Sequence, residues 1–287
     1  MIDSPSRLLR GWLRRQLPLD DFAWLEAQVE RARGGSDRDL HIALGLAPRR
    51  LGKADLTLSD TDLADAAAAR SGWDPRGWSV DQAARVLLLL AGGGDGHAFA
   101  ARFRDLCRTA DPAEAVAFYR GLPLYPAPEL LEAQAGEGLR TNMRAVFEAV
   151  AHRSPFPRER FDQGRWNHMV LKALFVGSTL APIQGLDEGA NPELALILRD
   201  YAHERWAAGR PVSPELWRCL GPFAAELGLD DLRRVVAEGD AVERQAAALA
   251  LAACPGAEAA ALLATMPDLA AGIATGALTW DALTPDP

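Results

Sequence analysis

The residues between positions 139 and 206 include many side chains that can make specific hydrogen bonds. They lie in segments with helical spacing, where a purely structural surface would carry interchangeable glutamate and lysine. Seven of these side chains are candidates for a binding site. Four of the seven carry a positive charge at neutral pH, in a chain whose formal net charge is -8. Arginine and lysine recognise phosphate and carboxylate groups through charge-assisted hydrogen bonds. The candidate ligand- or partner-binding residues are Arg140, Asn142, Arg144, Asn167, Lys172, His203 and Arg205.

Two interpretations of these seven residues remain open. In the first, they bind a partner or an anionic ligand, such as a phosphate or a carboxylate. In the second, they form hydrogen-bond and ion-pair networks that join helices. Because a positive charge is costly to bury without a partner, the second interpretation requires nearby carboxylates, and Glu148, Asp200 and Glu204 are suitable. We favour this internal neutralisation.

Familiar catalytic and cofactor-binding signatures are absent from the sequence. The glycine-rich segment 92–96 lacks the lysine of a phosphate-binding loop, and no predicted strand precedes it. His203 and Glu204 are not followed by the second histidine of a zinc-protease motif. His168 and His203 could meet from adjacent helices, but their spacing does not require a metal ion. We therefore expect no metal, no cofactor and no catalytic residues.

The cysteines, the apolar runs and the overall charge predict the cellular location and the kinds of partner. Cys107, Cys219 and Cys254 lie far apart and share no metal-ligand spacing, so we expect reduced, unpaired thiols. No apolar run approaches the roughly 20 residues of a membrane span, and residues 1–20 have no continuous apolar core. An acidic chain also repels the phosphate backbone of nucleic acids. We expect a soluble, cytoplasmic protein with no membrane span and no nucleic-acid partner.

Helix start and stop signals dominate the chain. A capping side chain directly before a proline at the first helical position favours a helix start. Three pairs have this form: Asp111-Pro112, Asn191-Pro192 and Ser213-Pro214. Ser79 and Gln82 form a capping-box pattern ahead of another apolar run. Because residues 52–58 are the only extended candidate, we predict an all-α protein with helix above about 60% and strand below about 5%.

The seven candidate residues fall on three predicted helices, at about 138–152, 162–177 and 192–208. Consecutive helices joined by short connections usually pack side by side. We therefore expect the seven side chains to cluster in space. The longest irregular connection, 175–192, separates the last two helices, and long loops on a rigid scaffold often carry binding sites.

The C-terminal part of the chain limits the possible architectures of the predicted helices. Residues 229–238, 240–253 and 257–266 are predicted to form three short helices, and Arg244–Ala252 resembles the second helix of HEAT-type repeats. Such helices must stack on neighbours to bury their apolar faces. We predict an irregular α-solenoid, a HEAT- or armadillo-like helical array, with a globular helical array as the alternative. We expect one domain over 1–287, comprising N-terminal helices (1–70), a central core (71–218) and HEAT-like C-terminal helices (219–287).

The central stretch of the chain resembles the EboA family. The similarity is strongest over residues 139–218 and looser on both sides, including Gly52–Asp55. Four segments carry it: Arg140–Ala149, Trp166–Phe175, Asn191–Ala195 and Asp200–Arg205.

The resemblance implies a gene-cluster context for the protein, but it implies no particular reaction. EboA proteins occur in bacterial and some algal-plastid gene clusters. Their neighbours resemble a sugar-phosphate cyclase, a UbiA-like prenyltransferase, a TIM-barrel isomerase and metal-dependent hydrolases. Such a cluster looks built to make, and help move, a small prenylated cyclitol-like metabolite.

The family has no established catalytic residues to carry over. The resemblance therefore favours a non-catalytic accessory, scaffold or binding protein, whose partners are other proteins of the cluster or a small anionic metabolite. The alternative is an enzyme with an unfamiliar helical active site, built from Arg140, Asn142, Lys172, His203 and Arg205.

Overall fold

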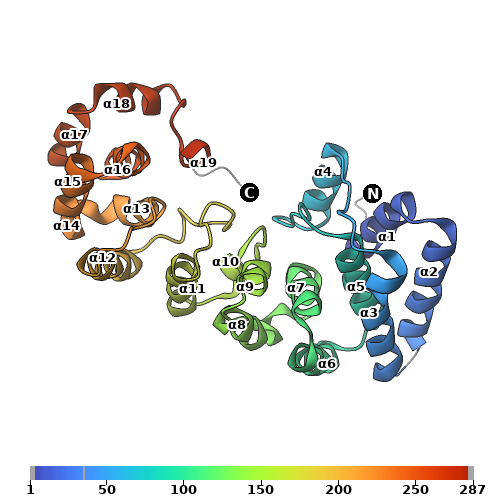
Figure 1. Cartoon of the computed structure of the whole chain (residues 1–287). Coiled ribbons are helices and arrows are strands. Elements are labelled where there is room, and N and C mark those ends of the chain that lie inside the picture. The colour runs from blue at the N-terminus through green and yellow to red at the C-terminus, as the bar shows by residue number, and fades with distance from the viewer. Residues whose placement is uncertain (1–3, 35, 284–287) are drawn as a thin grey trace. The chain divides into compact units, whose positions relative to one another are not determined.

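The computed structural model describes residues 4–34 and 36–283, and 72% of the described residues are helical. The all-α prediction is confirmed. Within these ranges, the extended segment 52–58 contributes only an isolated antiparallel bridge, between Asp55 and Ser79. The chain forms two compact units, unit 1 (Met1–Asp162) and unit 2 (Gln163–Pro287) (Figure 1). Their boundary lies inside the expected central core, and the three-part division of a single domain stays a prediction.

Most helices follow one another with short connections, and the irregular connection 175–192 in unit 2 is the main exception. Unit 1 contains α1 (Pro5–Gln16), α2 (Leu19–Gly34), α3 (Asp37–Leu51), α4 (Asp60–Ala69), α5 (Val80–Ala91), α6 (Gly96–Thr109), α7 (Pro112–Arg120), the 3-10 turns η1 (Leu122–Leu124) and η2 (Pro128–Leu130), α8 (Glu132–Arg140), α9 (Arg144–Ala151) and α10 (Phe156–Arg160). Unit 2 contains α11 (Gln163–Phe175), α12 (Pro192–Ala207), α13 (Leu216–Leu220), η3 (Gly221–Phe223), α14 (Ala224–Leu227), α15 (Leu229–Glu238), α16 (Ala241–Ala253), α17 (Ala257–Ala264), α18 (Pro267–Ala274) and α19 (Trp280–Leu283).

Helix α5 is the centre of unit 1, where it packs against α1, α2, α3 and α7. Its sequence explains this position, because its apolar residues are not confined to one stripe. Val86, Leu87, Leu88 and Leu89 are all at most 2% exposed. On the preceding turn, the small side chains of Ala83 and Ala84 are fully buried.

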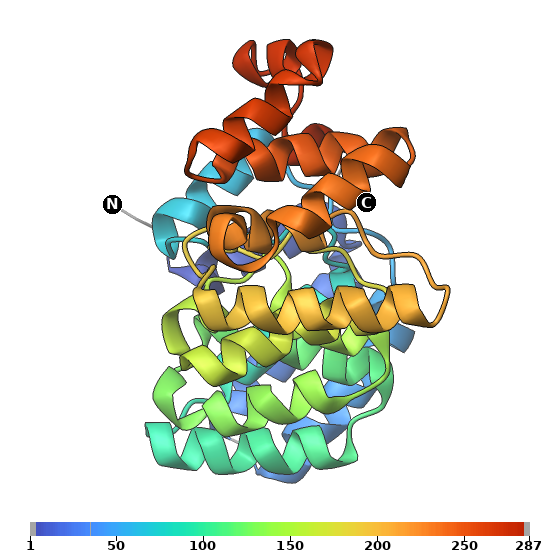
Figure 2. The same ribbon diagram turned by 90° about the vertical axis from the view of Figure 1, so that its left-hand side faces the viewer.

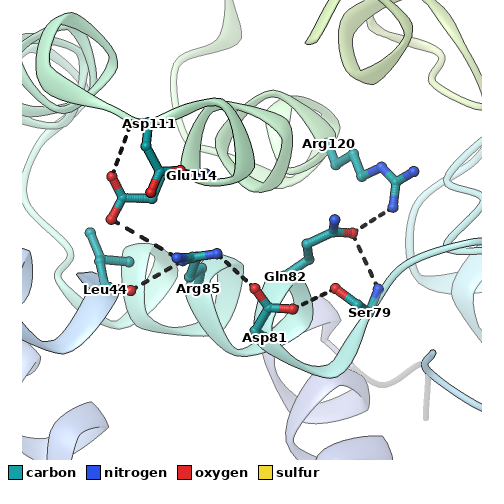
Figure 3. A network of polar contacts seen from close by, with 8 residues as sticks. All are labelled: Leu44, Ser79, Asp81, Gln82, Arg85, Asp111, Glu114 and Arg120. Carbon is teal, nitrogen blue, oxygen red and sulfur yellow. Dashed lines mark hydrogen bonds and ion pairs between the residues drawn. The ribbon is translucent and has the colours of Figure 1, made fainter. Parts of the chain in front are cut away.

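Two charged residues are nevertheless buried on α5: Asp81 is 3% exposed and Arg85 is 1% exposed. Arg85 Nη1 lies 2.7 Å from Asp81 Oδ2, and Arg85 Nε donates to the carbonyl oxygen of Leu44 on α3 at 3.1 Å. Its Nη2 lies 4.0 Å from Glu114 Oε1 on α7. Glu114 Oε2 in turn accepts the N–H of Asp111 at 3.2 Å (Figure 3). One guanidinium thus connects α3, α5 and α7.

Helix α16 has the corresponding central place in unit 2, where it packs against α13, α15, α17, α18 and α19 (Figures 1 and 2). Every residue from Ala246 to Leu251 is buried. Small residues allow this packing: an ideal Cβ on Gly221 would lie 2.8 Å from the carbonyl oxygen of Ala250. A larger residue at 221 would therefore force the two backbones apart.

The helix predicted over about 138–152 is wrong, because the chain forms two helices there, α8 and α9. The backbone of Thr141 is extended and ends α8. Its hydroxyl then accepts the N–H of Met143 at 3.1 Å, which competes with helical hydrogen bonding. The link 141–143 between the two helices becomes part of the site described below.

The predicted caps have different outcomes. Asp111 Oδ1 accepts the N–H of Glu114 at 2.8 Å, and Asn191 Oδ1 accepts the N–H of Leu194 at 2.9 Å, so these two caps are confirmed. The cap predicted at Ser213-Pro214 is wrong, because α13 begins only at Leu216. The residues before it form a turn instead, in which the Ser213 carbonyl accepts the N–H of Leu216 at 3.1 Å.

Among the residues that the structure describes, no single helix is both long and apolar enough to span a bilayer. The consecutive helices α17 and α18 satisfy both requirements only when taken together, and they are bent by 110° relative to each other. Both helices pack against α16 within unit 2.

The buried pair on α5 predicts a large effect on stability. We expect Asp81→Ala to lower the free energy of unfolding by about 3–5 kcal/mol, because it leaves Arg85 buried beside only a distant carboxylate. Arg33→Ala, which removes an exposed pair with Glu30, should cost less than about 1 kcal/mol. Chemical denaturation of both variants measures this difference. Equal losses would show that Asp81 does not neutralise Arg85.

Candidate functional site

A cavity of about 420 Å³ lies in unit 1, where α6, α7 and α8 meet the link between α8 and α9. Cavities of this size accept small organic molecules. Its apolar wall consists of Ala110, Pro112, Ala115 and Val146. Its polar lining includes Arg104, Cys107, Arg108, Tyr119, Gln134, Glu137 and Thr141, and Gly138 and Met143 complete it.

Tyr119 is fixed in the cavity wall by α7 and α8. Helix α7 begins at the Asp111 cap and is buried from Ala115 to Tyr119. On α8, Gln134 Nε2 donates to the Tyr119 hydroxyl at 2.9 Å. Gly138 lets α8 approach the ring, since an ideal Cβ there would lie 2.8 Å from Tyr119 Cζ. The position of the phenol therefore depends on a glycine in the middle of a helix.

Burial keeps the thiol of Cys107 and the phenol of Tyr119 protonated at neutral pH. It raises the pKa of the Cys107 thiol from 9.0 to about 12, and the hydrogen bond with Tyr119 opposes this only in part. Burial is also the main reason that the pKa of Tyr119 is raised, and Cys107 and Glu137 raise it further. Because the thiolate is the nucleophilic form of cysteine, the thiol and the phenol can offer hydrogen bonds but no ready nucleophile at neutral pH.

The rim of the cavity is more cationic than anionic. Arg104 and Arg108 extend from α6 and are exposed. Arg108 Nη2 lies 3.5 Å from Asp105 Oδ1, while no carboxylate among the described residues lies within ion-pair distance of Arg104. Glu137, the acidic residue in the lining, pairs with Arg140 at 2.7 Å. The rim therefore suits a ligand that carries a negative charge.

Three of the seven sequence-predicted residues lie beside this cavity, although they do not line it. Arg140 ends α8, Asn142 lies in the link, and Arg144 begins α9, whereas the alternating residues Thr141 and Met143 face the cavity. Arg140 Nη1 lies 2.7 Å from Oε1 of Glu137, one turn earlier on α8. Arg144 Nε lies 2.6 Å from Glu148, one of the carboxylates expected to neutralise the group.

The other four predicted residues lie in unit 2, on α11 and α12. Asn167 is 2% exposed, and its amide group exchanges hydrogen bonds with the amide of Asn191, at 2.8 and 3.3 Å. Lys172 Nζ lies 5.4 Å from the centre of the Phe175 ring. The remaining two residues, His203 and Arg205, lie on α12 and contact groups outside that helix.

His203 Nε2 lies 2.7 Å from Asp231 Oδ1 on α15, and Arg205 Nε donates to the carbonyl of Pro211 at 2.9 Å. Asp200, an expected partner of the cationic group, pairs with Arg199 instead, at 3.1 Å. The seven residues are thus divided between the two units, and their clustering in one site stays a prediction.

The irregular connection 175–192 is held by a residue that sequence reasoning missed. Glu215 is 4% exposed, and its carboxylate accepts the N–H groups of Leu180 and Ala181 at 2.8–3.0 Å. Arg218 adds a bidentate pair with Asp187, at 2.7 and 2.8 Å. This part of the loop is therefore fixed to the residues around α13.

The lining residues of the cavity on α6 and α7, Cys107 and Tyr119 among them, were also missed by sequence reasoning. The one local signal was Gly138, because a glycine within a helical pattern often marks a close approach.

The comparisons with known proteins place the chain in a family. A family model described as "Metabolite traffic protein EboA" matches residues 5–221. The chain therefore belongs to the EboA family, and the matched range includes every residue of the cavity. No curated protein and no solved structure matches the chain.

The raised thiol pKa values predict an alkaline loss of stability. Burial raises the pKa of Cys107 and of Cys219 from 9.0 to about 12. In the unfolded chain these thiols ionise above about pH 9, while the folded chain keeps their protons, so the unfolded state gains stability. Between pH 9 and 12, we expect each thiol to lower the free energy of unfolding by about 1.4 kcal/mol per pH unit.

Denaturation at pH 8, 9 and 10 measures this slope in the wild type and in Cys107→Ala. The variant should lose stability less steeply above pH 9 than the wild type. Identical slopes would mean that the Cys107 thiol ionises as readily in the folded state as in the unfolded one.

Proposed function

We propose that this member of the EboA family is a non-catalytic accessory protein that binds a small metabolite in the cavity between α6, α7 and α8. The observation that carries the proposal is the cavity itself, with its volume of about 420 Å³, apolar wall and buried hydrogen-bonding groups. These features are typical of sites that bind organic molecules. The printed description of the family, a metabolite traffic protein, agrees with this role.

The chemistry of the lining supports binding over turnover. A carrier must hold its ligand without reacting with it, and protonated Cys107 and Tyr119 meet that requirement. Both side chains can still recognise polar groups on a ligand. The arginines of the rim, Arg104 and Arg108, would favour an anionic metabolite over a neutral one.

The cellular part of the proposal follows from the family resemblance. We propose that the protein works in the cytoplasm and supports the biosynthesis or transport of a prenylated cyclitol-like metabolite made by enzymes of its gene cluster. A HEAT-like α-solenoid would give those enzymes an extended docking surface. Within unit 2, the packing of α15, α17 and α18 on α16 is compatible with such stacking.

The alternative is an enzyme that uses Arg140, Asn142, Lys172, His203 and Arg205. We favour it less, because several of these side chains already have partners within their own unit. His203 is held by Asp231 at 2.7 Å, for example, and Arg205 by the carbonyl of Pro211 at 2.9 Å.

The proposal predicts that filling the cavity removes the ligand. Ala110 lines the cavity, ends α6 with an extended backbone and is half-buried, so Ala110→Trp can place an indole in the cavity without changing a helix interior. We expect a small molecule to co-purify with the wild-type protein from its native host. Native mass spectrometry should show this molecule at least about tenfold less abundant on Ala110→Trp.

Ala133→Trp is the matched control, because Ala133 is exposed on α8 and does not line the cavity. It should retain the ligand. Equal retention by Ala110→Trp and the wild type, or a wild-type protein without any bound small molecule, would contradict the proposal. A ligand that changes mass during incubation with the protein would favour the enzyme instead.

A further inference from the structure

Gln134 is a half-buried amide in the wall of the cavity, and only part of it has a partner. One proton of its Nε2 is donated to the Tyr119 hydroxyl at 2.9 Å. Neither its second Nε2 proton nor its Oε1 makes a hydrogen bond with the residues that the structure describes. The amide therefore offers the cavity one open donor and one open acceptor.

The direction of the hydrogen bond at Tyr119 depends on Cys107, which forms a chain with it. A hydrogen bond lowers the pKa of a group when it is donated to the charged form. Burial raises the pKa of the Cys107 thiol, and the hydrogen bond with Tyr119 lowers it, so the phenol donates to the sulfur. Burial and Cys107 raise the pKa of Tyr119, whereas Gln134 lowers it as a donor. The amide nitrogen of Gln134 therefore faces the phenol, and Oε1 is left for another group.

The amide is held by a group that is itself rigid. Tyr119 is 4% exposed, and its ring meets the Phe103 ring edge-on, with the ring centres 6.2 Å apart. An ideal Cβ on Gly138 would lie 2.8 Å from Tyr119 Cζ and 2.8 Å from Cγ2 of Val150, so α8 packs closely against both side chains. A ligand that binds a preorganised amide loses little affinity to the ordering of side chains.

Arg104 approaches the cavity from α6 with a different kind of group. Its side chain is exposed, and its guanidinium makes no hydrogen bond or ion pair with the part of the chain that the structure describes. A guanidinium has donors only, and its planar geometry suits the oxygens of phosphates and carboxylates. A hydroxyl group, in contrast, both donates and accepts, as the open groups of Gln134 require. One ligand can satisfy both residues if it carries both groups.

We propose that Gln134 is a specificity-determining residue of the cavity, which selects small oxyanions that also carry a hydroxyl group. The phosphate or carboxylate of the ligand binds Arg104, and its hydroxyl donates to Oε1 of Gln134. The proposal rests on the proposed binding of a metabolite in this cavity, and it adds the chemical class of the ligand.

Pairs of probes that differ only in their hydroxyl groups test the proposal. Glycerol phosphate and propyl phosphate share their charged group and their three-carbon chain, as do glycerate and propionate. We expect the wild type to bind the hydroxylated member of at least one pair about tenfold more tightly in calorimetric titrations at low ionic strength, because one hydrogen bond is gained. The pair with the larger preference identifies the charged group as phosphate or carboxylate.

Three variants separate the two groups. Gln134→Met removes the open acceptor at a similar side-chain length, so it should bind both members of a pair equally. Arg104→Gln removes the positive charge, so it should weaken the binding of both members by the same factor and keep the preference. Gln245→Met, on α16 of unit 2, is the matched control and should bind all probes like the wild type.

Equal affinities of the wild type for both members of each pair, a preference that persists in Gln134→Met, or no binding of any probe would overturn the inference. These results would leave the proposed function standing. That function is decided separately, by the molecule that co-purifies with the wild type and by its loss from Ala110→Trp.

Discussion

The burial of Arg85 on the central helix of unit 1 constrains much of that unit. A guanidinium that is 1% exposed must find acceptors inside the protein, because an unpaired buried charge is very costly. Asp81 supplies the nearest charge, the Leu44 carbonyl fixes the position of α3, and Glu114 connects the cation to α7. A different arrangement of α3 or α7 around α5 would leave this cation without one of its acceptors.

The cavity of unit 1 depends on the position of α7. Glu114 belongs to the capping box with Asp111 that starts this helix. Two turns later, Tyr119 faces the cavity, and the next residue, Arg120, reaches back to α5. Consecutive residues of a helix point about 100° apart, so one helix end serves two separate surfaces. The buried ion pair thereby supports both the position of Tyr119 in the cavity wall and the contact of Arg120 with α5.

The proposed binding of a ligand in the cavity agrees with the description of the family. A protonated thiol and a protonated phenol in a partly apolar pocket favour retention of a ligand without reaction, which is what a protein of metabolite traffic requires. The arginines at the rim, Arg104 and Arg108, are local exceptions in an acidic chain. Under the proposed function, they would favour negatively charged ligands that the remaining surface would repel.

The sequence by itself determined the helices whose signals are local. The caps at Asp111 and Asn191 were predictable because a side chain and an N–H three residues later satisfy each other. The break at Thr141 was not, because the same residues also fit a continuous helix. Only the tertiary structure decided where the cavity lies and which residues line it. Gly138 is important because α8 can approach the Tyr119 ring only without a side chain at that position. Charge alone could not show that Arg140 and Arg144 pair within one helical turn. Nor could it show that Thr141 and Met143 face the cavity.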